Sequence, residues 1–274
     1  MIKEYDLKLY TDTSTADSVL YEMYVDRIGQ LLIDCGLFDD VVITKPQSSG
    51  TYSDYYVEGK IENNTVVKFS LVAAPVTYTS ASRKVLNGQK FTVFYDNGVS
   101  SREAVLSTTM QGTSSQGQYG CSKAHVTSNG VIIQAYLYGT GSSATWGSIV
   151  IARSNKDYPL ITFPEFDSYN NARSSVLACH TISIASVCFP EPSYYVSGRT
   201  LNNSAAQYFY NATAKQTLMF PFAGYASING DRMYSKYSFW IPFAPASLRN
   251  SAFQKVQVNG KQYVIDGYFA LRDD

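Results

Sequence analysis

The stretch KVQVNGKQYVIDGYFALRDD, residues 255–274, carries the clearest strand pattern in the sequence. Val256 and Val258 alternate with polar neighbours, and Asn259-Gly260 follows, a dipeptide typical of two-residue hairpin turns. The alternation resumes over residues 263–271. Because chain ends usually fray unless other elements hold them, this pattern predicts that the segment is built into a β-sheet.

Further apolar alternations, separated by turn-forming residues, run from about residue 50 onward. Their turns are expected at Asn63-Asn64, Asn97-Gly98, Asn129-Gly130 and Asn229-Gly230. Such a series is typical of antiparallel hairpins, and the regular alternation of strands and helices that marks a parallel sheet is absent. We therefore expect residues 46–274 to form an antiparallel β-sandwich or meander body, with a division into two lobes near residue 150 left open.

One segment, Ala16 to Cys35, has a helical period. Its apolar residues recur at steps of three and four: Leu20, Met23, Tyr24, Ile28, Leu31, Leu32 and Cys35. Ser14 and Asp17 suit an N-terminal capping arrangement, and Gly36 suits the left-handed residue after the last turn. With "YDLKLY" before the helix and "DDVVITK" after it, residues 1–45 are expected to form strand, helix and strand. The predicted fold class is mainly β with one N-terminal amphipathic helix (α+β).

The composition is poor in charge and rich in tyrosine. Only 16% of the residues are charged, 23 are Tyr, and 22 basic residues balance 22 acidic ones. A protein that binds nucleic acid directly needs a basic patch, which this balance does not predict. A surface with few charges is easily covered by protein partners, because few charges must then be desolvated.

The N-terminal sequence "MIKEYDLKLYTD" has charges where a signal peptide needs an apolar run, and no apolar run reaches membrane-spanning length. We expect synthesis in the cytosol and no membrane partner. The four cysteines lack CxxC spacing and are expected to be thiols in that reducing compartment. A disulfide between Cys179 and Cys188 across neighbouring strands is the alternative left open.

No motif predicts catalysis, a metal or a cofactor. Gly139, Gly141 and Ala144 match the G-x-G-x-x-A spacing of dinucleotide sites, but the residues that follow, "TWGSIVIA", are typical of a strand rather than the required helix. Cys179 and His180 are adjacent, so on a strand they point to opposite faces and cannot readily share one metal ion. We expect no catalytic residue and no enzyme; a hydrolase using His125 or His180 is the weakest alternative.

The mainly β body with a single helix, the Tyr/Ser/Thr/Asn-rich composition and the closing "VNGKQYVIDGYFALRD" together resemble bacteriophage virion structural proteins of the tail, neck or baseplate type. As a motif the resemblance covers the last twenty residues; the rest matches as a type of composition. It implies a non-enzymatic subunit that assembles with copies of itself, as a symmetric oligomer or ring, and with other virion proteins. Its location would be the virion, after synthesis in the host cytoplasm.

Two sets of residues are candidates for contact. The candidate interface comprises Leu20, Tyr24, Leu31, Val256, Val258, Tyr263, Tyr268 and Phe269. The alternative is a carbohydrate- or receptor-binding β module at a tail tip, whose ligand would stack on Trp146, Trp240, Tyr194 and Tyr195.

Overall fold

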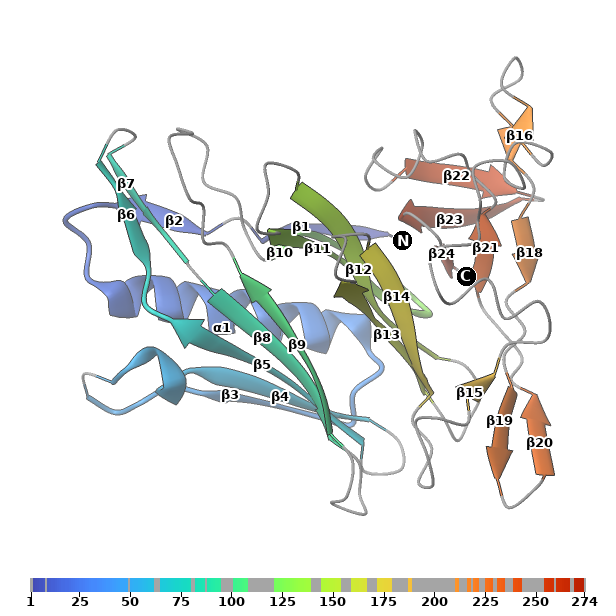
Figure 1. Ribbon diagram of the computed structural model, residues 1–274, viewed down its shortest axis with the longest axis horizontal. Coiled ribbons are helices and arrows are strands. Elements are labelled where there is room, and N and C mark those ends of the chain that lie inside the picture. The colour runs from blue at the N-terminus through green and yellow to red at the C-terminus, as the bar shows by residue number, and fades with distance from the viewer. Residues whose placement is uncertain are drawn as a thin grey trace. The chain divides into compact units, whose positions relative to one another are not determined.

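The protein is described by a computed structural model, in which one α-helix and many short strands are visible (Figure 1). The structure describes residues 2–7, 9–48, 50–61, 65–79, 82–86, 88–94, 101–107, 121–138, 144–153, 159–166, 172–178, 187–188, 210–211, 216–217, 219–221, 225–228, 231–234, 239–242, 254–258, 260–266 and 269–273. Within these residues, every strand pair of known register is antiparallel. The predicted mainly β class with one helix is confirmed.

The chain divides into two compact units. The helix unit comprises residues 5–124 and 135–146, and the terminal unit comprises residues 1–4, 125–134 and 147–274. The division expected from the sequence, an element of residues 1–45 and a body of residues 46–274, stays a prediction.

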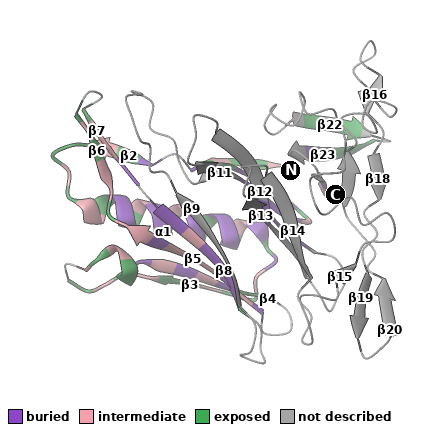
Figure 2. Ribbon diagram, viewed as in Figure 1, coloured by how far each residue is buried: buried purple, intermediate pink, exposed green. Residues whose placement is uncertain are grey.

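In the helix unit, the amphipathic helix covers one sheet. Helix α1 (Asp17–Cys35) packs on the first three strands of a sheet with the order β3-β4-β5-β8-β9. These strands are β3 (Asp40–Thr44), β4 (Tyr56–Ile61), β5 (Thr65–Ala73), β8 (Gly88–Phe94) and β9 (Ser101–Ser107). Figure 2 shows buried residues along α1 and along β5 and β8. The apolar face of the helix therefore belongs to the core of this unit. Burying each large apolar side chain there contributes about 1.5–3 kcal/mol to its stability.

The two ends of α1 differ in how well the sequence predicts them. Gly36 has a φ of 65°, and its N–H bonds the carbonyl of Ile33, so the predicted left-handed C-cap is confirmed. The predicted cap at Ser14 is wrong. A turn closed by the hydrogen bond from Thr15 N to Asp12 O precedes the helix, and Ala16 becomes the N-cap without any side-chain bond.

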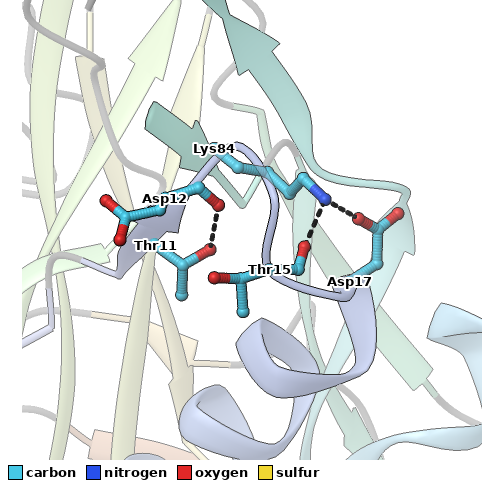
Figure 3. Close-up of polar contacts among 5 residues, drawn as sticks. All are labelled: Thr11, Asp12, Thr15, Asp17 and Lys84. Carbon is cyan, nitrogen blue, oxygen red and sulfur yellow. Dashed lines mark hydrogen bonds and ion pairs between the residues drawn. The ribbon is translucent and has the colours of Figure 1, made fainter. Parts of the chain in front are cut away.

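A lysine from another strand stabilises this end instead. Lys84 lies on β7 (Arg83–Val85), and its Nζ donates to Thr15 O at 2.6 Å and to Asp17 Oδ1 at 2.7 Å (Figure 3). Only 13% of its side chain is exposed. The ammonium group therefore ties the helix start to a small sheet, β2-β7-β6, which also contains β2 (Tyr10–Asp12) and β6 (Val76–Tyr78).

The segment "YDLKLY" is two strands rather than the one expected. Strand β1 (Lys3–Asp6) ends at the second residue of this segment, Asp6. Strand β2 begins at the last residue of the segment, Tyr10. The two strands join different sheets, and Leu7 and Leu9 between them are buried. Because the two strands pair with different sheets, a segment whose alternation predicts one strand forms two.

A second sheet runs as a meander, with the order β1-β10-β11-β12-β13-β14. Its later strands are β10 (Cys121–Thr127), β11 (Gly130–Tyr138), β12 (Ala144–Arg153), β13 (Pro159–Phe166) and β14 (Ala172–Ala178). Because β12 begins at Ala144, a strand and not a helix follows Gly139 and Gly141, as predicted. The fingerprint of a dinucleotide site therefore lacks its helix here.

Three strands within residues 254–273 belong to a five-stranded sheet in the terminal unit. Its order is β18-β21-β24-β23-β22, with strands β18 (Met219–Pro221), β21 (Phe239–Pro242), β22 (Gln254–Val258), β23 (Lys261–Asp266) and β24 (Phe269–Asp273). The predicted incorporation into a sheet is confirmed, and β24 is its central strand. The unit also contains the short strands β15 (Val187–Cys188), β16 (Tyr210–Asn211), β17 (Gln216–Thr217), β19 (Tyr225–Ile228) and β20 (Asp231–Tyr234).

The hairpin signals place their strands correctly. The pairs β4–β5, β8–β9, β19–β20 and β22–β23 are antiparallel and flank the predicted turns, and β10 and β11 are neighbours on either side of Asn129-Gly130. The turn residues Asn63-Asn64, Asn97-Gly98 and Asn229-Gly230 themselves lie outside the described residues.

Candidate functional site

The outer hairpin of the terminal sheet contains the predicted interface residues Val256 and Val258. Strand β22 pairs with β23 over the register from Gln254↔Ile265 to Val258↔Lys261. Gly260 in the turn has a φ of 78°, a conformation that glycine adopts without strain. Since β22 stands at the end of the sheet order, one side of its backbone is not paired within this sheet.

The described side chains of this hairpin separate into a polar and an apolar set. Lys255, Gln257, Lys261 and Gln262 are exposed. Tyr263, which was predicted for the interface, is instead buried, with 4% of its surface exposed. The side chains of Val256 and Val258 lie outside the description, so their roles stay predictions.

A charged cluster links β22 to the first strand of the chain. Lys255 Nζ donates to Glu4 Oε1 on β1, and His125 Nε2 on β10 lies 3.5 Å from the same oxygen. The His125 side chain is 4% exposed, while that of Glu4 is 57% exposed. The hydrogen bond from Lys255 lowers the pKa of Glu4 below its ordinary value of 4.5, against a smaller opposite effect of burial.

The sequence does not predict this cluster, because in the sequence His125 stands only as an isolated candidate base. Its three members are far apart in the chain and carry no spacing signal. What the arrangement does chemically is to hold a carboxylate in its charged form between two basic side chains. It thereby joins β1, β10 and β22 within the terminal unit.

Two polar contacts join β24 to the turn between β10 and β11. The amide of Ser128 donates to Asp273 Oδ1 at 3.1 Å, and Asn129 Nδ2 donates to Arg272 O at 3.0 Å. Asp273 is 9% exposed, so water screens the contact poorly. The central strand of the terminal sheet is thus bonded at its sides by neighbouring strands and near its last residues by a hairpin turn.

The helix residues proposed for the interface lie in the core of the helix unit. Leu20 and Leu31 are 0% exposed and Tyr24 is 2% exposed. Their helix contacts β3, β4 and β5. These three side chains therefore face their own subunit, and a partner could reach only the other faces of α1.

The remaining candidates are placed only by their strands. Trp146 belongs to β12, and Trp240 belongs to β21, where it pairs with Pro221 and Ala270. Phe269 is the first residue of β24. Tyr194, Tyr195 and Tyr268 lie outside the described residues, as do Cys179 and His180. The sugar-stacking alternative and the Cys179–Cys188 disulfide stay predictions.

The described part of the chain offers neither a cluster of metal-ligating side chains nor a helix that could span a membrane. There, no three His, Cys, Asp or Glu side chains gather as a metal site would require. Cys35 is a buried thiol rather than a disulfide partner. None of the described helical residues forms a segment both long and apolar enough to cross a bilayer.

Comparison with known proteins gives no relative: no family model and no curated protein matches the chain.

Proposed function

We propose that the protein is a structural assembly subunit of a bacteriophage particle, a component of the tail, neck or baseplate, which acts through contacts with copies of itself and with other virion proteins. The virion setting rests on the resemblance of the composition and of residues 258–273 to such proteins. The mode of action rests on the structure of the terminal sheet.

The observation that carries the proposal is the position of β22. Among the described strands only β23 pairs with it, so the backbone groups on its other side can accept a strand from a neighbouring molecule. The one lysine of β22, Lys255, a residue type that often protects an edge strand, is paired with Glu4 on β1 rather than left free at the edge. The strand is also fixed in register, since all five of its residues pair with β23.

The geometry of the hairpin identifies the backbone groups that face outward. A two-residue turn closes with a hydrogen bond between the residues that flank it, here Val258 and Lys261. Because antiparallel pairs alternate between hydrogen-bonded and non-hydrogen-bonded, Gln257↔Gln262 is of the second kind. The N–H of Gln257 therefore points away from β23, toward any added strand.

Replacing Gln257 with proline tests the proposal. Proline is tolerated on an edge strand where its missing N–H would have faced solvent, so Gln257→Pro should fold yet lose assembly. The matched control Gln257→Ala keeps the N–H and should assemble like the unmodified protein. The measurements are molar mass by light scattering, images of the assembly by electron microscopy, and incorporation into phage particles.

Assembly and particle incorporation by the unmodified protein, both lost in Gln257→Pro, would support the proposal. A protein that is strictly monomeric and also fails to join particles would overturn it. If specific glycan binding were found instead, and were lost in Trp146→Ala or Trp240→Ala, the receptor-binding alternative would replace it.

A further inference from the structure

The outer strand of the other five-stranded sheet, β3, is paired on one side only by the strands that the structure describes, and its sequence is self-complementary. It stands at the end of the order β3-β4-β5-β8-β9, and among the described strands only β4 pairs with it (Figure 1). Its residues, Asp-Val-Val-Ile-Thr, contain no proline and no lysine. Proteins usually protect such an edge with those residues or with a bulge, and β3 lacks these features over its whole length.

Apolar side chains are exposed along this edge. Six large apolar side chains are exposed among the described residues, and two of them, Val42 at 46% and Ile43 at 37%, are consecutive in β3. A third, Ile33 at 52%, lies on α1. Three of the six exposed large apolar residues in the described part of the chain are therefore Val42, Ile43 and Ile33, and a fourth, Val19, lies near the other end of α1.

Two contacts show that Ile33 lies on the side of the helix nearest β3. Lys45, just after β3, forms an ion pair with Asp26 at 2.7 Å. A Cβ added to Gly29 would lie 2.3 Å from the Ile43 side chain, so the helix approaches β3 closely there. Ile33 is four residues after Gly29 and thus on the same face of the helix. With Ile43 it forms an exposed apolar strip on the helix side of this edge, while Val42, next to Ile43 in the strand, is exposed on the opposite face of the sheet.

The charges flanking this strip are arranged for pairing with an identical strand. The sequence from Asp39 to Lys45 begins with two acidic residues and ends with a basic one. In an antiparallel pair of two copies centred on Val42, each Val41 faces Ile43, and each Asp39 faces Lys45. Asp39 is exposed and Lys45 keeps 35% of its side chain exposed, so both can be reached by a partner.

The opposite edge of the same sheet does not have these properties. Strand β9 carries Arg102 and Glu103 within its length, so centred pairing of two copies places those charges opposite Leu106 and Val105. Charges within an edge strand are a recognised protection against strand addition. In β3 the charges stand only at the ends, where they fix direction and register.

We propose that β3 is a homodimer interface, in which two copies of this chain pair their β3 strands antiparallel about a two-fold axis through Val42. The interface is isologous, because each copy presents the same surface to the other. It joins the two sheets into one continuous sheet. This inference deepens the homo-oligomeric part of the proposed function and assigns it a second surface, separate from β22.

A cysteine at the axis tests the geometry. Residues directly opposite in an antiparallel pair have Cβ atoms about 4.5–5.5 Å apart, close to the range that a disulfide bridges. Val42→Cys should therefore form a covalent dimer under mild oxidation, seen on a non-reducing gel. Phe94→Cys is the matched control, since Phe94 is 39% exposed but lies on β8, which is paired on both sides, by β5 and β9; it should give only the background of the unmodified protein.

Charge reversal tests the register. Either single variant, Asp39→Lys or Lys45→Asp, places like charges opposite each other at two positions in the dimer. Each should raise the dissociation constant of the dimer about tenfold or more. The double variant Asp39→Lys/Lys45→Asp restores opposite charges and should recover most of that loss. Asp26→Asn removes the partner of Lys45 within the subunit, and should leave dimerisation nearly unchanged.

The outcomes separate this inference from the proposed function. Failure of Val42→Cys to cross-link above background, or failure of the double variant to recover dimerisation, would overturn the β3 interface. If such a protein still joined phage particles, the proposed function would stand. Cross-linking at Val42 in a protein that never joins particles would support the interface and contradict the virion role.

Discussion

The two five-stranded sheets of this protein are stabilised in different ways. In the helix unit, β3, β4 and β5 are consecutive in the chain and α1 covers them with its apolar face. In the terminal unit, the central strand β24 is inserted between β21 and β23, and polar contacts reach it from the β10–β11 turn. The first sheet therefore depends mainly on buried apolar area, and the second also on hydrogen bonds between distant segments.

The largest effect should come from the helix core. Leu31→Ala removes a side chain that is 0% exposed and leaves a cavity between α1 and the sheet, which should lower the free energy of unfolding by about 2–5 kcal/mol. Urea denaturation measures this. Val19→Ala on the same helix, where the side chain is 39% exposed, should cost much less. Equal losses in the two variants would mean that the helix is not held by its buried face.

A smaller effect is expected from the polar contact of the terminal sheet. Asp273→Ala removes the carboxylate that accepts the Ser128 amide, at a cost of about 0.5–1.5 kcal/mol in unfolding free energy. Asp273→Asn keeps a side-chain oxygen and should retain most of the stability. Faster hydrogen exchange of the Ser128 amide in the alanine variant would locate the change. Unaltered exchange would show that the contact does not hold the strand.

The smallest effect should be pH-dependent and come from Glu4. Its pKa is lower in the folded protein than its ordinary 4.5, mainly through the Lys255 hydrogen bond. Its contribution is therefore present above pH 4.5 and is lost as the pH falls through the folded pKa. Because Glu4 is 57% exposed, Glu4→Gln should cost about 0.5 kcal/mol at pH 7, and this cost should shrink as the pH falls below 4.5 and through the folded pKa. A difference that is constant with pH would contradict this role of the ion pair.

The features that the sequence predicts well are those set by neighbouring residues. The helix period predicts the burial of Leu20, Ile28 and Leu32, and the left-handed Gly36 marks the end of the helix. Asn-Gly dipeptides predict the hairpins because the turn geometry itself selects those residues. Strand alternation predicts that residues 255–274 join a sheet.

Features set by contacts between distant residues could not be predicted from the sequence. Nothing near Ser14 signals that Lys84, about seventy residues later, holds the start of the helix in place of a cap. The division of residues 5–10 between two sheets depends on β7 and β10, and the Glu4, His125 and Lys255 cluster has no sequence spacing. The central position of β24 is a matter of strand order, which local alternation does not encode.

That central position has a consequence for biosynthesis. The ribosome delivers β18, β21, β22 and β23 before β24, so the pairs β18–β21 and β22–β23 can form early as separate fragments. Only when residues 269–273 emerge can the two fragments join, and until then each exposes an open edge to the crowded cell. Completing this sheet is a late, non-local step that should limit the folding rate, and nascent chains stalled before residue 269 should be strong clients of molecular chaperones.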